Sequence, residues 1–124
     1  MSDEFEANLG KELADADRVV ILGVGNELRD DDYLGLAVAR ELEKAISSEK
    51  YQVTVAGSAP ENFTREIKEA SPSLVLFIDS ADMGKEPGCI EIIEKDRIAN
   101  VTYSTHNLPL SILADYLTSE IGCR

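Results

Sequence analysis

The sequence predicts an α/β protein with an open, mostly parallel sheet and helices on both faces. Residues 18–24 and 74–79 are apolar runs of strand length, which suit strands covered on both sides. Segments with helical spacing alternate with these strands, and such alternation favours a parallel sheet. The 124 residues suit one domain. We therefore expect a single domain over residues 1–124, with a helical N-terminal extension (1–17) and an α/β core (18–122).

In the first half of the chain, two helices flank the first strand. Phe5, Leu9 and Leu13 recur every four residues, which predicts a short amphipathic helix. After the strand at 18–24, Asp31 or Asp32 can cap a second helix. We expect that helix to turn one apolar stripe toward the sheet, formed by Leu34, Val38, Leu42 and Ile46, with Ala37 and Ala45 beside it.

In the second half, strands and helices continue to alternate. A strand is predicted at 51–55, and the Gly-Ser-Ala-Pro sequence at 57–60 should break it. A short helix at 61–70 then leads into the strand at 74–79. Two weaker strands, both expected at an edge of the sheet, and a closing helix follow at 89–94, 100–103 and 108–121.

The charge of the chain limits its partners. Its 24 acidic and 12 basic residues give a formal net charge of −12. Nucleic acids and anionic membranes attract basic surfaces, so neither is an expected partner. The longest apolar runs are too short to span a bilayer, and the acidic N-terminus lacks the features of a secretory signal. We expect a soluble, cytoplasmic protein with no membrane insertion.

Three chemically active positions follow predicted strands. An acidic run, Asp30–Asp32, follows the first strand, Asp79 ends the strand at 74–79, and His106 follows the strand at 100–103. Ligands of open α/β sheets bind at the carboxyl ends of the strands. Two carboxylates and an imidazole at one edge could hold a divalent ion such as nickel or zinc.

Simpler interpretations of these residues remain open. The acidic run can be a solvated loop that caps a helix, and Asp79 can stabilise a turn through its side chain. His106 can be a surface residue. A different class of function is also open, because Asp79 ends an apolar strand as the phosphoacceptor of a signalling receiver domain would, with Asp31 or Asp32 holding magnesium.

Five ordered sequence blocks resemble a known family. They are 23–35 (GVGNELRDDDYLG), 57–62 (GSAPEN), 78–84 (IDSADMG), 87–88 (PG) and 104–110 (STHNLPL). In this order they are similar to the maturation endopeptidases of nickel–iron hydrogenases, in the branch that serves formate-hydrogenlyase-type hydrogenases. The resemblance covers residues 19–122, and five blocks in order are more specific than any one motif.

The resemblance implies an activity and roles for named residues. It implies an endopeptidase that removes the C-terminal extension of a hydrogenase large-subunit precursor after nickel has been inserted. Nickel is then supplied by the precursor, and a zinc-like divalent ion is the alternative in the isolated protein. The implied metal-binding and catalytic residues are Asp32, Asp79 and His106. We add Asp31 or Asp32 as the base that activates water, and Gly25, Asn26, Gly57 and Ser58 as substrate-binding positions.

Members of the family continue beyond the position of Gly122 with a strand and a helix, which this chain lacks. A missing strand would expose a sheet edge, which leaves two explanations: this is a truncated or naturally shortened form, or a second copy in a homo-oligomer covers the edge. A further alternative is therefore a shortened form that binds the precursor or the metal without cleaving.

Overall fold

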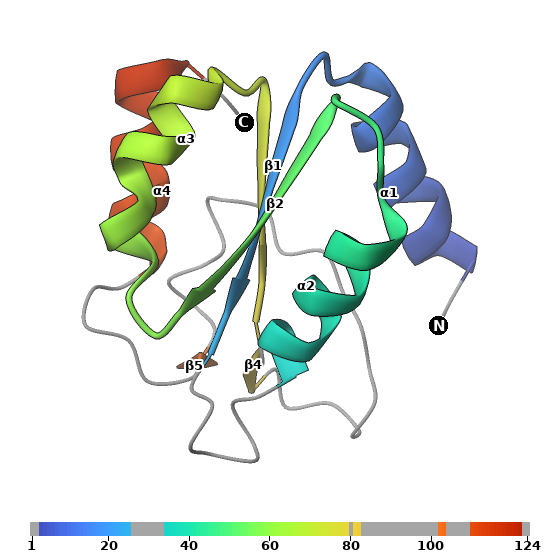
Figure 1. Ribbon diagram of the computed structural model, residues 1–124, viewed down its shortest axis with the longest axis horizontal. Coiled ribbons are helices and arrows are strands. Elements are labelled where there is room, and N and C mark those ends of the chain that lie inside the picture. Colours follow the sequence, from blue (N-terminus) through green and yellow to red (C-terminus); the bar gives the residue numbers. More distant parts are fainter. Residues whose placement is uncertain (1–2, 26–33, 80, 83–101, 104–109, 123–124) are drawn as a thin grey trace.

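Three parallel strands form the centre of the structure, in the order β2-β1-β3 (Figure 1). Their bounds are β1 (Val19–Val24), β2 (Tyr51–Gly57) and β3 (Leu74–Ile78). The computed structural model describes residues 3–25, 34–79, 81–82, 102–103 and 110–122. The strand β1 runs parallel to both of its neighbours, which confirms the predicted α/β fold with an open parallel sheet.

Helices cover both faces of this sheet. On one face lie α1 (Asp3–Asp15) and α2 (Leu34–Ala45), and on the other lie α3 (Thr64–Ala70) and α4 (Leu110–Ile121) (Figure 1). The connections β1–α2–β2 and β2–α3–β3 cross the sheet in opposite directions. Right-handed crossovers therefore require α2 and α3 to lie on opposite faces. Within the described part of the chain, no helix is long and apolar enough to cross a membrane.

The core of the molecule is built around β1, whose six residues are all buried. Val20, Leu22 and Val24 face the cluster under α3 and α4, whereas Val19 and Ile21 face the cluster under α1 and α2. The first cluster also contains Ala56, Ile67, Leu113 and Leu117, and the second also contains Ala16 and Leu74. This burial on both faces explains why the β1 sequence is continuously apolar rather than alternating.

The predicted inward stripe of α2 is partly wrong. Leu42 and Ile46 pack against the core as expected, but Leu34 is 62% exposed. The buried residues of α2 are Gly35, Leu36 and Ala39. Because glycine and alanine have little or no side chain, this face lets the helix backbone approach the sheet closely. A pattern that weighs large apolar residues does not detect such a face.

Several element bounds in the second half also differ from the prediction. β2 continues through Gly57, where a break was predicted, because β1 and β2 shift register so that Val24 pairs with Gly57. The predicted helix at 61–70 begins as the 3-10 turn η2 (Pro60–Phe63) before α3. A strand that was not predicted, β4 (Ala81–Asp82), pairs with β5 (Thr102–Tyr103), which lies within the predicted strand at 100–103. The predicted strand at 89–94 lies outside the described residues.

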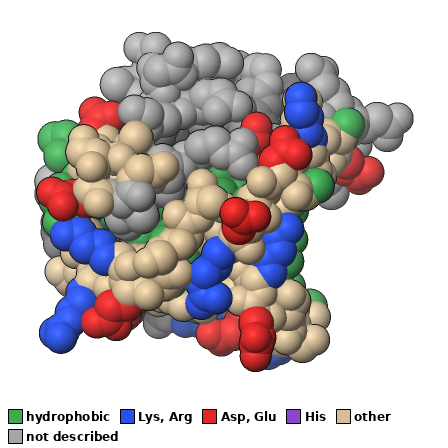
Figure 2. Space-filling model, turned by 90° about the horizontal axis from the view of Figure 1, so that it is seen from above, with side chains coloured by type: hydrophobic (Ala, Val, Ile, Leu, Met, Phe, Trp, Pro, Cys, Tyr) green, Lys and Arg blue, Asp and Glu red, His purple; other side chains and the backbone are tan. Residues whose placement is uncertain are grey.

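Hydrogen bonds close the amino end of the sheet. The Ser73 hydroxyl oxygen accepts hydrogen bonds from the backbone N–H groups of Asp17 (2.9 Å) and Arg18 (3.3 Å). The Ser73 N–H also donates to the Arg18 carbonyl at 2.9 Å, and Lys50 Nζ donates to the Leu13 carbonyl at 2.7 Å. Figure 2 shows side chains of both charge signs interspersed over this end of the molecule. These contacts join α1, β1 and β3 and stabilise the fold.

Replacing Ser73 with alanine should destabilise the protein. The two N–H groups of Asp17 and Arg18 would lose their acceptor, which we expect to lower the free energy of unfolding by about 1–2 kcal/mol. Urea unfolding followed by circular dichroism measures this change. Ser47→Ala, in an exposed loop, is the control and should change stability by less than about 0.5 kcal/mol. Equal urea midpoints for Ser73→Ala and Ser47→Ala would contradict this stabilising role of the Ser73 hydroxyl.

Candidate functional site

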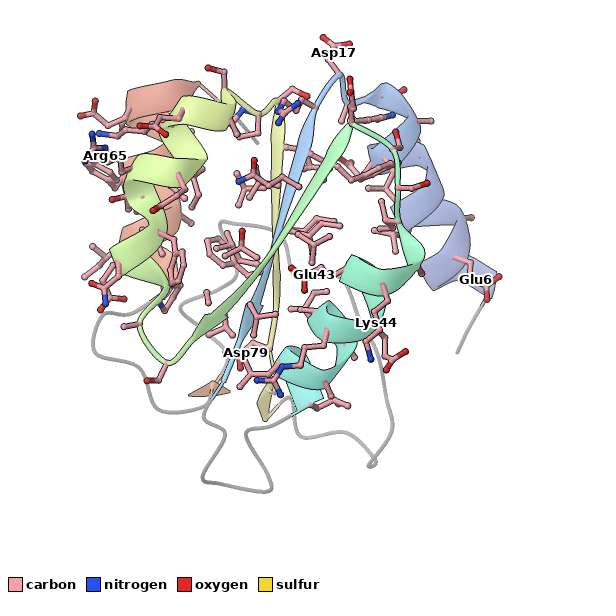
Figure 3. The ribbon with its side chains drawn as sticks, viewed as in Figure 1. Glu6, Asp17, Glu43, Lys44, Arg65 and Asp79 are labelled. Atoms are coloured by element: carbon pink, nitrogen blue, oxygen red, sulfur yellow. The ribbon has the colours of Figure 1, made fainter. Side chains whose placement is uncertain are left out.

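The carboxyl ends of β1, β2 and β3 meet at one edge of the fold, which we call the carboxyl rim (Figure 1). Asp79 follows the last residue of β3 and is partly exposed. Figure 3 shows it at this rim, at the opposite end of the sheet from Asp17. The position that the sequence suggests for this carboxylate is therefore the one it occupies in the fold.

Two of the predicted substrate-binding positions meet at the same rim. The Gly25 N–H donates a hydrogen bond to the Gly57 carbonyl at 3.0 Å, joining the ends of β1 and β2. Gly57 has a φ of 73°, which favours glycine, and a Cβ placed there would meet no atom of the described residues within 4 Å. The half-buried Ser58 follows directly. The hydrogen bond and the positive φ thus define the backbone conformation at the end of β2.

The start of α2 is held against this rim by glycine packing. A Cβ added to Gly35 would overlap the carbonyl oxygens of Val24 and Ile78, which end β1 and β3. A Cβ added to Gly23 would lie 2.7 Å from the Gly35 carbonyl oxygen. Because the obstructing atoms include backbone, no rotamer change could relieve the overlap. The first turn of α2 therefore lies directly beside the residue that precedes Asp79.

The segments after Asp79 and before α4 are joined by a short strand pair. β4 begins two residues after Asp79, and its Ala81 pairs with Tyr103 of β5. In the second pair of this antiparallel ladder, Asp82 lies opposite Thr102. Figure 1 shows the pair just beyond the carboxyl ends of the three parallel strands. β5 is thereby joined to the strand β4 that follows Asp79.

The remaining predicted site residues, Asn26, Asp31, Asp32 and His106, lie outside the described residues. Of the three predicted metal ligands, the structure therefore describes Asp79. Among the described residues, no group of three or more His, Cys, Asp and Glu side chains could hold a metal ion. The predicted ligand set and the choice of base stay predictions.

The sequence interpretation gave no role to one further carboxylate at this rim. Glu61 lies in η2, shortly after the end of β2. One of its carboxylate oxygens, Oε1, is shielded from solvent, and within the part of the chain that the structure describes it accepts no hydrogen bond. The signal that could have identified it is its place in the 57–62 block, directly after a strand of the parallel sheet.

A lysine and a tyrosine on the outer surface form a hydrogen bond between α3 and α4. Lys68 of α3 donates a hydrogen bond to the Tyr116 hydroxyl of α4, and its ammonium lies 4.7 Å from the centroid of the Tyr116 ring. This hydrogen bond raises the pKa of Lys68 above its ordinary value. The pair joins two helices on the same face of the sheet and has no contact with Asp79.

Comparison with known families gives one match that covers most of the chain. The family model described as HycI, hydrogenase maturation protease, matches residues 36–124. The matched part includes Asp79, β4, β5 and α4, together with most of α2.

Individual relatives agree with this match. A Methanocaldococcus jannaschii protein named as a hydrogenase maturation protease is 40% identical over 117 residues, covering 89% of this chain and 69% of the relative. The hydrogenase 3 maturation protease of Escherichia coli is 42% identical over 106 residues, covering 83% of this chain and 66% of the relative. The chain thus spans about two thirds of the length of these two relatives.

A solved structure shares the fold. The crystal structure of a nickel–iron hydrogenase maturation protease, HycI, from Thermococcus kodakarensis superposes with a TM-score of 0.78 at 30% sequence identity. The superposition covers 94% of this chain and 74% of the other. The sheet and the two helical layers are therefore those of the solved protease.

Proposed function

This chain belongs to the hydrogenase maturation protease family, and on that premise we propose that it cleaves the C-terminal extension from a nickel-loaded hydrogenase large-subunit precursor. The family consists of endopeptidases, which are hydrolases acting on peptide bonds. Membership argues against the signalling receiver alternative, in which Asp79 would accept a phosphoryl group.

The observation that carries the proposal is the packing of Gly35 against the residue that precedes Asp79. Asp32 is three residues before Gly35, and a chain of that length reaches at most about 11 Å. His106 is three residues after Tyr103, which pairs with Ala81 close to Asp79. These chain lengths support the proposal that Asp32 and His106 lie near Asp79.

The chemistry of these side chains fits a nickel-bearing substrate. Carboxylate oxygens and an imidazole nitrogen are donors that suit nickel and zinc. Three protein donors leave coordination positions for ligands of the precursor, so Asp32, Asp79 and His106 would contact the nickel that the substrate carries. A zinc-like ion is the proposed occupant in the isolated protein.

Hydrolysis needs a base that activates water and residues that bind and position the scissile peptide. We assign proton removal from water to Asp31 or Asp32. The water oxygen then bonds to the scissile carbonyl carbon, the C–N bond breaks, and the departing amine takes the proton that the carboxylate removed from water. Gly25, Asn26, Gly57 and Ser58 are the proposed binding positions for the precursor segment.

Nickel dependence is the property that tests this function. We expect the chain to shorten the nickel-loaded precursor and to leave the nickel-free precursor intact. Without nickel, the metal-binding residues of the chain would have no metal ion to bind on the precursor. The measurement follows the mass of the precursor C-terminus over time, with both samples at equal concentration. At saturating enzyme the two rates should differ by at least about 100-fold, equivalent to about 2.7 kcal/mol.

The controls separate the possible failures. The Escherichia coli relative, assayed on its own precursor, checks that nickel loading succeeded. Equal cleavage of both samples would contradict the nickel requirement. Binding of the nickel-loaded precursor without any product would contradict hydrolysis and identify the chain as a binding protein.

A further inference from the structure

Leu34, the first residue of α2, is a large apolar side chain at the surface beside the carboxyl rim. It is 62% exposed, so burial within the fold does not account for it. Its neighbour Gly35 packs against the carbonyl oxygen of Ile78, the residue directly before Asp79. Leu34 and Asp79 are therefore each one residue away from the same backbone contact, and Leu34 is accessible to a binding partner.

The apolar surface at Leu34 continues along α2. A shallow depression of about 400 Å³ begins within the next helical turn and is lined by Ala37, Val38, Glu41, Leu42 and Ala45. Because Leu34 and Val38 are four residues apart, they lie on the same side of the helix. A single exposed leucine is common on protein surfaces. Here the leucine and the depression form one apolar surface that starts at the carboxyl rim, which we call the α2 strip.

The size and charge of the α2 strip favour a short polypeptide segment over a second copy of this chain. A stable protein interface takes about 20–30 residues from each side, whereas the strip supplies Leu34 and the five residues of the depression. Two copies would also bring together net charges of −12 each. Glu41, the charged residue of the strip, already lies 3.8 Å from Lys44 Nζ in an ion pair. The strip therefore suits apolar side chains.

We propose that the α2 strip binds apolar side chains of the precursor in the segment next to the scissile peptide bond, with Leu34 making the contact nearest to Asp79. This inference rests on the proposed function. The chain would then select its substrate by the apolar side chains of that segment as well as by nickel. Removal of a leucine side chain from water on binding strengthens the complex at least about tenfold.

The test compares Leu34→Gln with Leu34→Met. Glutamine has a similar length and a polar end, whereas methionine keeps the apolar volume. Ile112→Gln is the matched control, because Ile112 is 54% exposed in the first turn of α4, on the opposite face of the sheet from α2 (Figure 1). The measurements are the Kd for the nickel-loaded precursor, KM and kcat for its cleavage, and the thermal midpoint of the free chain.

We expect Leu34→Gln to raise Kd and KM at least about tenfold and to leave kcat at the wild-type value, because Leu34 binds substrate without taking part in proton transfer. This loss should be the same at low and at high salt, since no charge changes. Leu34→Met should keep Kd within about threefold of wild type, and Ile112→Gln should bind as wild type does. The thermal midpoints should stay close to that of wild type, because both residues are exposed.

Four results would overturn the inference. They are an unchanged Kd for Leu34→Gln, an equal loss of affinity in Ile112→Gln, a loss that follows a lowered thermal midpoint, and a wild-type dimer that Leu34→Gln dissociates without any change in precursor binding. The last result would identify a second copy as the occupant of the strip. If wild type neither binds nor cleaves the precursor, the proposed function fails as well. If wild type does both while Leu34→Gln matches it, the role of the α2 strip alone is wrong.

Discussion

Gly35→Ala is expected to abolish precursor cleavage and to lower the free energy of unfolding by about 3 kcal/mol, the upper end of the usual loss from overpacking. The added methyl group would overlap the carbonyl oxygens of Val24 and Ile78. These are backbone atoms of two strands, so α2 would have to move away from the sheet. That movement would separate the first turn of α2 from the end of β3, which Asp79 follows.

The measurement pairs urea unfolding with the cleavage assay. Gly10→Ala is the matched control, because Gly10 is an exposed residue of α1 and a Cβ there meets no atom of the described residues within 4 Å. It should stabilise the protein by about 0.5–1 kcal/mol and leave cleavage unchanged. A urea midpoint of Gly35→Ala equal to that of wild type would show that α2 can move away from the carboxyl rim without loss of stability. The proposed convergence of Asp32 and Asp79 would then lose its support.

The strands β1 and β3 could be predicted from the sequence because their apolar residues follow one another without interruption. β1 and β3 are continuous apolar runs, and β1, which lies between two strands under two helical layers, needs that composition. The contact face of α2 could not be predicted in the same way. Its closest approach to the sheet uses Gly35 and Ala39, whose small size is informative only once the facing strands are known.

The carboxyl rim was predictable because parallel strands bring their ends to one edge, which places Asp79 from its position after β3 alone. β4 was not predicted because a strand of two residues is too short to show an alternating or a continuous apolar pattern. Its pairing partner in β5 is about twenty residues away along the chain. Glu61 was missed for a different reason, since the absence of a hydrogen-bond partner is a property of the folded surroundings.

Asp79→Asn is expected to reduce cleavage of the nickel-loaded precursor by at least about 100-fold, since changes to partners of metal ligands already lower activity 10- to 100-fold. Asparagine has nearly the same shape as aspartate and lacks its charge. The substitution therefore removes a negatively charged oxygen donor at the end of β3 while keeping the volume of the side chain. Because Asp79 is partly exposed, the thermal midpoint should stay close to that of wild type.

Asp17→Asn is the matched control, because Asp17 is exposed at the opposite end of the sheet (Figure 3). Both variants lose one negative charge, so a shared effect would reflect the overall charge of the chain rather than a site. Full cleavage by Asp79→Asn would remove Asp79 from the site. A defect in Asp79→Asn alone, with precursor binding retained, would place this carboxylate in the cleavage step, because recognition would then depend on other contacts.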